Sequence, residues 1–444
     1  MKKLVLFLFV AILFSSCDPT IDNPIGTGSL GNLGSNNNTF VYVAIGSSIS
    51  AGANSGAIFM DAQDYCFPKL LAKQLGVGVW EQADVENPGI GNRMFLKGFL
   101  NPSAPILVTK QVISNVSNIS YSKAYNNLSI LFGVANDLID TSDFATRAAL
   151  YGNPFYSVVL RNSAFGKSMA DQAISLNPNL VTIELGLTDI YMYAIYGGAK
   201  STFGMPNDPM PTPTAAFNMI MNAGLTKLSA SLQNTKFIIF NIPDLLCAPY
   251  FNTVPWNALV IDENTAAMLN QAYKPLGFTF KAGANGFVAA SPKSPGGLRQ
   301  LTANDHVLLS VPQDSLKAGW GSAKPIPNEY VLDSIEIATV KGTITTYNNI
   351  IENLKNISPN IYIFDFANLF KDGKSTVIKV PASSALTTRF ISGGMFSYDG
   401  INPSSKMQGA IVNELIKYLN TTFKSDLQLV NISNIPGNTI TLNP

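Results

Sequence analysis

The sequence predicts an α/β domain of three layers, in which helices cover both faces of a doubly wound, mostly parallel five-stranded sheet. Two observations lead to this prediction: short apolar runs rich in β-branched residues recur along the chain, and amphipathic helical patterns separate them. Runs this apolar suit strands that are buried on both faces, as in a parallel sheet between helices. The expected strands are 40–46, 128–133, 180–186, 236–243 and 361–366, and the expected helices are 67–75, 162–176, 214–232, 343–354 and one from Pro403 onward.

One long segment, about 250–340, interrupts this alternation between the fourth and fifth expected strands. It is rich in proline and glycine and contains only short apolar stretches. A loop of this length without structure is uncommon in a compact domain. We therefore expect a folded insertion or lid near the site.

The first residues resemble a bacterial lipoprotein signal. Two lysines precede an unbroken apolar run from Leu4 to Phe14, and Cys17 follows after small residues. The run is shorter than the roughly 20 residues that a spanning helix needs. We expect a signal peptide over 1–16, lipidation of Cys17, and a Gly/Asn-rich flexible tether over 17–39 before a domain over 40–444. The alternative is a simple secretory signal with an incidental cysteine.

This reading places the protein in a bacterial cell envelope, anchored by lipid to the outer membrane and facing the periplasm or the surface. Net charge is +1, charged residues make up 13% of the chain, and no segment gathers lysines and arginines. Nucleic acid and anionic membrane surfaces therefore have no evident docking site. The membrane contact is expected through the anchor alone, and the oligomeric state is left open.

Cofactor and metal motifs are weak. Gly26, Gly28 and Gly31 satisfy G-x-G-x-x-G, but no strand precedes them and no helix follows. His306 is the sole histidine, and no Cys-x-x-Cys or carboxylate cluster surrounds it. We expect neither a cofactor nor a metal. Cys66 and Cys247 would allow one disulfide, and the sequence leaves their pairing open.

Ser48 is the first candidate for chemistry, because it follows the first expected strand in the run Gly46-Ser47-Ser48. A serine on a tight turn between strand and helix exposes its hydroxyl, and nearby backbone N–H groups can face a developing oxyanion. Taken alone this pattern is weak, since most Ser/Gly-rich strand ends are only turns.

Several stretches together are more specific. YVAIGSSISAGANSG, DYCFPKLLAKQL, NPNLVTIELGLTDIY, FNIPDLLCAPYF and FSYDGINPS follow one another in the order expected for SGNH (GDSL-type) hydrolases, in a lipoprotein branch of Bacteroidetes type. The resemblance covers residues 40 to about 435. It implies that Ser48 is the nucleophile, with Ser47 in place of the Asp of the GDSL block, and that the Gly133 N–H helps to form the oxyanion hole.

Two positions depart from the family pattern. The G-x-N-D block reads Gly186-Leu187-Thr188-Asp189, so the amide donor of the oxyanion hole is replaced by the Thr188 hydroxyl. Loss of such a donor costs roughly 10²- to 10³-fold in turnover. The D-x-x-H motif begins at Asp399 and ends at Asn402, which has no titratable nitrogen to serve as general base. Loss of that base costs roughly 10⁶-fold.

Alternative interpretations remain for three of these positions. Asn402 precedes a proline and a helix, so it could be only an N-cap. His306 could supply the base from the insertion. Asn136-Asp137 also resembles the G-x-N-D block, although the residues that precede 186–189 match the family more closely.

Three functions are open at this point. The first is hydrolysis of small acyl, lipid or acetylated-glycan esters, and the second is binding of a lipid or glycan without catalysis. The third is a purely structural role in the envelope. We expect a retained hydrolase pocket whose activity is reduced or lost, because the triad is incomplete.

Overall fold

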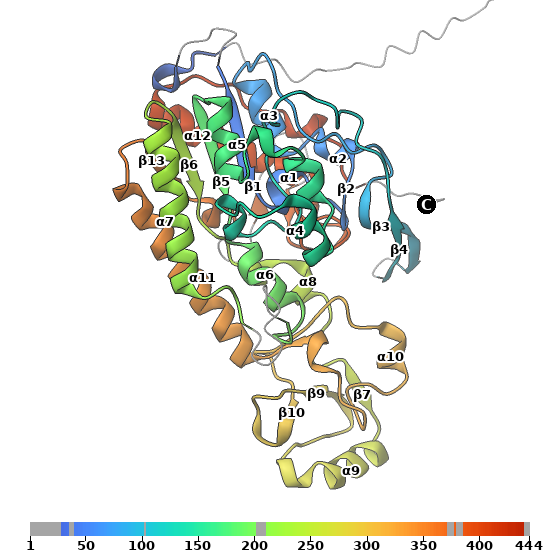
Figure 1. Cartoon of the computed structure of the whole chain (residues 1–444). Helices are drawn as coiled ribbons and strands as arrows, with labels where there is room; N and C mark the ends of the chain where they lie inside the picture. Colours follow the sequence, from blue (N-terminus) through green and yellow to red (C-terminus); the bar gives the residue numbers. More distant parts are fainter. Residues whose placement is uncertain are drawn as a thin grey trace, which may run out of the picture.

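Four parallel strands form the central sheet of the computed structural model, which describes residues 28–34, 40–101, 104–200, 210–370, 377–378 and 385–438 (Figure 1). The first two strands lie side by side, with Gly46 next to Glu184, and every residue in both is buried. The order across the sheet is β1 (Tyr42–Gly46), β5 (Leu180–Glu184), β6 (Lys236–Phe240) and β13 (Ile361–Phe364). The chain is therefore α/β with a parallel sheet, and four of the expected strands are present.

The expected regular strand over 128–133 is absent. Instead, the segment that begins at Asn126 runs along the free edge of β1, where Ala44 donates to the Asn126 carbonyl and accepts from the Leu128 N–H, both at 2.8 Å. The pairing stops after Ile130, because Phe132 adopts a left-handed φ of 57° and turns the chain. β1 thus has one neighbour on each side, an arrangement in which ligands bind beyond the carboxyl ends of the strands.

Helices cover both faces of the sheet, with α3 packed on α12 behind it in Figure 1 and with α5, α7 and α11 packed together in front. Three helices begin elsewhere than expected, since each starts at the first side chain that caps it: Ser168, Asp333 and Ser404. The five helices are α3 (Phe67–Gln74), α5 (Met169–Leu176), α7 (Thr214–Ser231), α11 (Ser334–Asn353) and α12 (Ser405–Phe423). Shorter helices of the same part of the chain are α1 (Ser48–Ala51), α2 (Met60–Gln63), α4 (Phe144–Tyr151) and α6 (Thr188–Ile195).

The segment between β6 and α11 is folded and occupies the lower part of Figure 1. Two small apolar clusters form its interior, one around Phe287 and Val307 and the other around Leu269 and Phe280. Its helices are α8 (Pro249–Asn252), α9 (Glu263–Ala272) and α10 (Gln313–Lys317), and its short strands are β7 (Leu259–Ile261), β8 (Gly283–Asn285), β9 (Val288–Ala290), β10 (Leu298–Gln300), β11 (His306–Val307) and β12 (Val331–Leu332).

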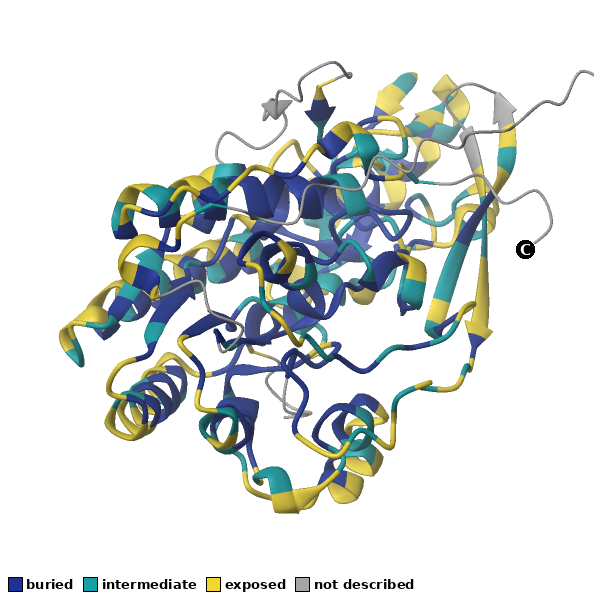
Figure 2. Cartoon of the chain, turned by 90° about the horizontal axis from the view of Figure 1, so that it is seen from above, coloured by how far each residue is buried: buried dark blue, intermediate teal, exposed yellow. Residues whose placement is uncertain are grey.

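Figure 2 shows the buried residues gathered on the sheet and on the inner sides of the helices, with exposed residues outside.

An antiparallel hairpin that the sequence did not suggest lies beside the central sheet. The hairpin belongs to a three-stranded sheet of β2 (Ala57–Ile58), β3 (Ile90–Asn101) and β4 (Ala104–Val112), and a further short pair is β14 (Val377–Ile378) with β15 (Leu386–Thr387).

Part of the expected tether is packed. Leu30 and Leu33 are buried, and the 3-10 helix Gly31–Leu33 lies against α12. The expected signal peptide and Cys17 lie outside the described residues. Within the described ranges, no helix has both the length and the apolar character needed to cross a membrane.

Candidate active site

Ser48 begins α1 directly after β1, at the carboxyl edge of the sheet. Its Oγ accepts a hydrogen bond of 3.0 Å from the Phe132 N–H, and the residue is 8% exposed. The turn before it requires glycine at position 46, since a Cβ there would lie 2.3 Å from the Ser50 Oγ. The hydroxyl is thus fixed in a tight turn and oriented by a backbone donor from another segment.

Glu184, at the end of β5, holds this turn in place. It is not among the residues predicted from the sequence. Its carboxylate accepts from the Ser47 Oγ at 3.0 Å and the Ser50 Oγ at 2.9 Å, and from the backbone N–H groups of the same two residues. Burial raises the pKa of Glu184, and these donors oppose that effect. An acid that ends an otherwise apolar strand was the available signal. Glu184 therefore positions the residues on either side of Ser48.

Gly133 departs from its expected geometry. Its N–H donates to the Ile130 carbonyl at 2.8 Å, so it is already engaged within the turn. The N–H directed at Ser48 belongs to Phe132, one residue earlier, because the left-handed conformation of Phe132 points that group toward α1. The N–H that reaches Ser48 is thus that of Phe132 and not that of Gly133.

Thr188 begins α6, is buried, and follows β5 at the same sheet edge as Ser48. The next residue, Asp189, accepts the Ala135 N–H at 2.8 Å and so joins α6 to the segment that follows Phe132. Burial raises the pKa of Asp189 to about 7. Residues 186–189, which resemble the G-x-N-D block, thus follow the strand that neighbours β1.

Asp137 supports the same segment from its other side. It accepts the Val134 N–H at 2.8 Å and the Tyr156 hydroxyl at 3.0 Å, and Arg147 lies 3.5 Å away. Burial raises its pKa to about 6 despite the nearby guanidinium. These contacts give Asp137 a structural task in the loop that carries Phe132.

Asp399 is saturated with hydrogen-bond donors. A carboxylate has about four lone-pair sites, and five donors converge on this one. Its Oδ1 accepts from the Ser397 Oγ at 3.1 Å, the Ile401 N–H at 2.9 Å and the Asn402 N–H at 2.8 Å, and its Oδ2 accepts from the Gly56 N–H and the Asn402 Nδ2, both at 2.8 Å. Asp399 therefore organises its own loop and ties it to the chain that follows α1.

Asn402 does not cap the last helix. Ser404 is the N-cap of α12, and its Oγ accepts the Met407 N–H at 3.1 Å. The Asn402 side chain instead donates to Asp399, the contact that an acid makes with the imidazole of a serine hydrolase triad. The interpretation of Asn402 as a cap is wrong, because the helix begins two residues later than Pro403 suggests.

Aromatic side chains connect the two halves of the site. The Phe132 ring stacks on Tyr191 of α6 with centroids 6.0 Å apart. Burial, then the nearby charge of Asp399, raises the pKa of Tyr191 well above its usual value. The segment whose backbone contacts Ser48 is thereby joined by ring stacking to α6.

The segment 250–340 contacts the Asp399 loop at Gly400. The Tyr250 N–H donates to the Gly400 carbonyl at 2.9 Å, and a Cβ at Gly400 would lie 3.0 Å from the Leu309 side chain. His306 lies in β11, three residues before Leu309, and pairs with Leu332 of β12. Its ring lies edge-on to the Phe251 ring, with the centroids 6.3 Å apart. Tyr250 and Leu309 are thus the residues of this segment that reach the Asp399 loop.

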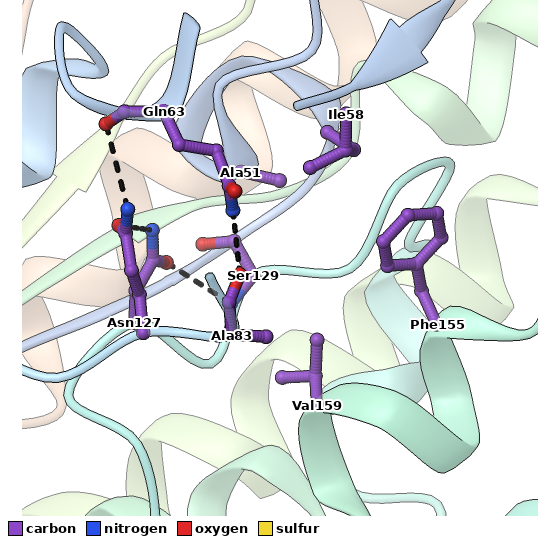
Figure 3. A pocket seen from close by; sticks show the side chains of 9 residues that line it. Ala51, Ile58, Gln63, Ala83, Asn127, Ser129, Phe155 and Val159 are labelled. Carbon is purple, nitrogen blue, oxygen red and sulfur yellow. Dashed lines mark hydrogen bonds between the residues drawn. The ribbon is translucent and has the colours of Figure 1, made fainter. Parts of the chain in front are cut away.

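A small cavity lies behind α1, lined by Ala51, Asn127, Ser129 and Phe155 among others (Figure 3). Its volume of about 10 Å³ suits one water molecule at most. The Ser129 Oγ is buried without a partner in the described part of the chain, so a water there would satisfy it. The cavity is too small for a substrate.

Cys66 and Cys247 are both buried free thiols, so they do not pair. Among the described residues, no three His, Cys, Asp or Glu side chains gather in a way that could hold a metal ion.

No protein-family model matches this sequence, and neither a curated protein nor a solved structure matches it.

Proposed function

We propose that this chain carries an ester-hydrolase pocket of the SGNH type, in which Ser48 is positioned for attack on an ester carbonyl but the general base is missing. The observation that carries the proposal is the 2.8 Å hydrogen bond from the Asn402 Nδ2 to Asp399. An amide occupies the place where a triad would have its imidazole, and an amide cannot accept the serine proton. Turnover is then strongly reduced or absent.

The surrounding contacts support the same proposal. The Phe132 N–H donates a hydrogen bond to the Ser48 Oγ, and Thr188 begins the helix after the neighbouring strand. A tetrahedral oxyanion on a carbon attacked by Ser48 would find its donors in this region. The edge segment from Asn126 pairs with the free side of β1, which supports the five-stranded arrangement that the resemblance implies.

Asp399 itself is a poor substitute for the base. Five donors already occupy its two oxygens, so proton uptake would break contacts that hold its loop together. The second candidate function, binding of a lipid or glycan ester without turnover, is favoured by this saturation. In either function the ligand class is a small acyl, lipid or acetylated-glycan ester, and the protein is a lipid-anchored lipoprotein of the cell envelope.

The test measures hydrolysis of a short-chain aryl ester by the purified mature chain. We expect Asn402→His to raise the rate by about 10²-fold or more, since a general base contributes roughly 10²- to 10⁴-fold. The double variant Ser48→Ala/Asn402→His should lose the gain. Asn431→His, at an exposed turn far along the sequence, is the matched control and should change nothing.

Two results would overturn the proposal. A folded Asn402→His variant without any gain would mean that the site no longer presents Ser48 to an ester. Substantial wild-type turnover that disappears in Ser48→Ala would mean that another residue provides the base.

A further inference from the structure

A second cleft lies outside the Ser48 site, between the β3–β4 hairpin and the beginning of α12. Its cavity volume is about 280 Å³, close to the lower end of the range for small-molecule sites, roughly 300 Å³. In Figure 1, β2, β3 and α2 lie beside one another on this side of the molecule. The walls come from segments distant in the sequence: Asn54 and Ser55, residues 59, 61, 62, 64 and 65, residues 93–95, Tyr398, Ser405 and residues 436–438.

Arg93 is held in a fixed orientation at one wall of this cleft. Its guanidinium lies 3.5 Å above the centroid of the Phe59 ring and 5.0 Å from that of Phe95. Its Nη1 donates to the Pro88 carbonyl at 2.6 Å. A guanidinium fixed by stacking and by a backbone acceptor loses little further freedom when it binds a ligand.

The polar groups around Arg93 have donors and acceptors to spare. Asn54 uses its Oδ1 to accept from Ser55, and Asp61 uses its Oδ1 to accept from Asn87, both at 2.8 Å. The Arg93 Nη2, the Asn54 amide nitrogen and the Asp61 Oδ2 have no partner within the described residues. The cleft therefore offers donors and acceptors together, next to aromatic surface.

These features identify a class of ligand. Arg93, Asp61 and Asp64 all line the cleft, and Lys69 pairs with Asp64 at 2.6 Å, so the cleft has no strong charge of either sign. A phosphate brings only acceptors and an ammonium only donors, whereas each hydroxyl brings both. The rings of Tyr65 and Tyr398 can cover the C–H face of a saturated ring. We propose that this cleft binds an uncharged sugar ring of a glycan.

The proposal does not rest on catalysis at Ser48. Tyr398 precedes Asp399 in the chain, but the side chains that the proposal uses line the second cleft. The experiment titrates the wild-type mature chain with four neutral trisaccharides, maltotriose, cellotriose, mannotriose and triacetylchitotriose, by calorimetry and saturation-transfer NMR. At least one should bind. Asp61→Ala and Tyr65→Ala should each weaken that binding at least tenfold, and Lys97→Ala, an exposed residue of β3 outside the cleft, should not.

Two outcomes would overturn the proposal: no binding of any trisaccharide, or equal binding by the wild type and both cleft variants. Circular dichroism of each variant separates lost binding from lost folding, and Asn54→Ala replaces any variant that fails to fold. The aryl-ester assay of Asn402→His is unaffected by these outcomes, so a failure here is distinguishable from a failure at Ser48.

Discussion

The turn around Ser48 and the loop around Asp399 both depend on a buried carboxylate, but the two carboxylates bind different partners. Glu184 accepts the hydroxyl and backbone donors of Ser47 and Ser50, the residues that flank the candidate nucleophile. Asp399 accepts from its own loop, from Gly56 and from the amide of Asn402. The first carboxylate holds the two residues that flank the candidate nucleophile, and the second holds an amide, which cannot take a proton.

In the proposed site, the contacts that position the serine are therefore separate from the group that would take its proton. Positioning needs hydrogen bonds of fixed geometry, and both regions have them. Proton transfer needs a group that titrates near the working pH, and an amide at position 402 does not. A site of this kind can keep its shape after its chemistry has been lost.

The largest expected effect on stability follows removal of the Asp399 carboxylate. Asp399→Ala leaves five donors without their acceptor, and each buried unsatisfied group costs about 1–3 kcal/mol before relaxation. We expect the free energy of unfolding to fall by about 3–5 kcal/mol, measured by urea denaturation. Because the Gly56 N–H is one of the five, the loss should also loosen the chain after α1.

Asp314→Ala is the control for this variant, since Asp314 is an exposed acid in a lone surface ion pair. Its unfolding free energy should stay within about 0.5 kcal/mol of the wild type. An Asp399→Ala variant as stable as Asp314→Ala would show that the loop relaxes to satisfy its donors elsewhere, and the contrast with the Ser48 turn would then fail.

An effect that is smaller per pH unit concerns Asp189, beside Thr188, whose pKa burial raises to about 7. The usual value in an unfolded chain is about 3.9, so between about pH 4 and 7 the folded state retains a proton that the unfolded state has released. Stability is therefore fully present below pH 4 and falls as the pH rises toward 7, by about 1.4 kcal/mol per pH unit. Asp189→Asn should lower that slope in urea unfolding curves recorded across this range.

The same curves for Asp314→Asn provide the comparison, because an exposed acid contributes little to the slope. Identical slopes for wild type and Asp189→Asn would mean that Asp189 is ionised throughout. The acids at this sheet edge would then resemble one another more closely than their different surroundings suggest.

The sequence predicted the parallel strands well, because runs such as Tyr42–Gly46 and residues 180–183 are mostly apolar and buried. It predicted the wrong geometry where one backbone torsion decides the outcome. The left-handed Phe132 ends the edge segment and sends its own N–H to Ser48, and side-chain patterns do not encode that torsion. Glu184 escaped notice because its partners, Ser47 and Ser50, lie more than 130 residues away in the chain.

The smallest effect separates the two polar residues at the start of α12. Ser404 caps the helix, so Ser404→Ala should cost about 1 kcal/mol of unfolding free energy. Ser404→Asn is the matched control, since asparagine is an equally good N-cap and should recover most of the loss. Asn402→Ala removes one of five donors to Asp399 and leaves the cap intact, so the initial turn of α12 should keep its amide exchange protection in that variant and lose it in Ser404→Ala. The opposite pattern would return Asn402 to the role of a helix cap, and its hydrogen bond to Asp399 would then carry no information about a lost base.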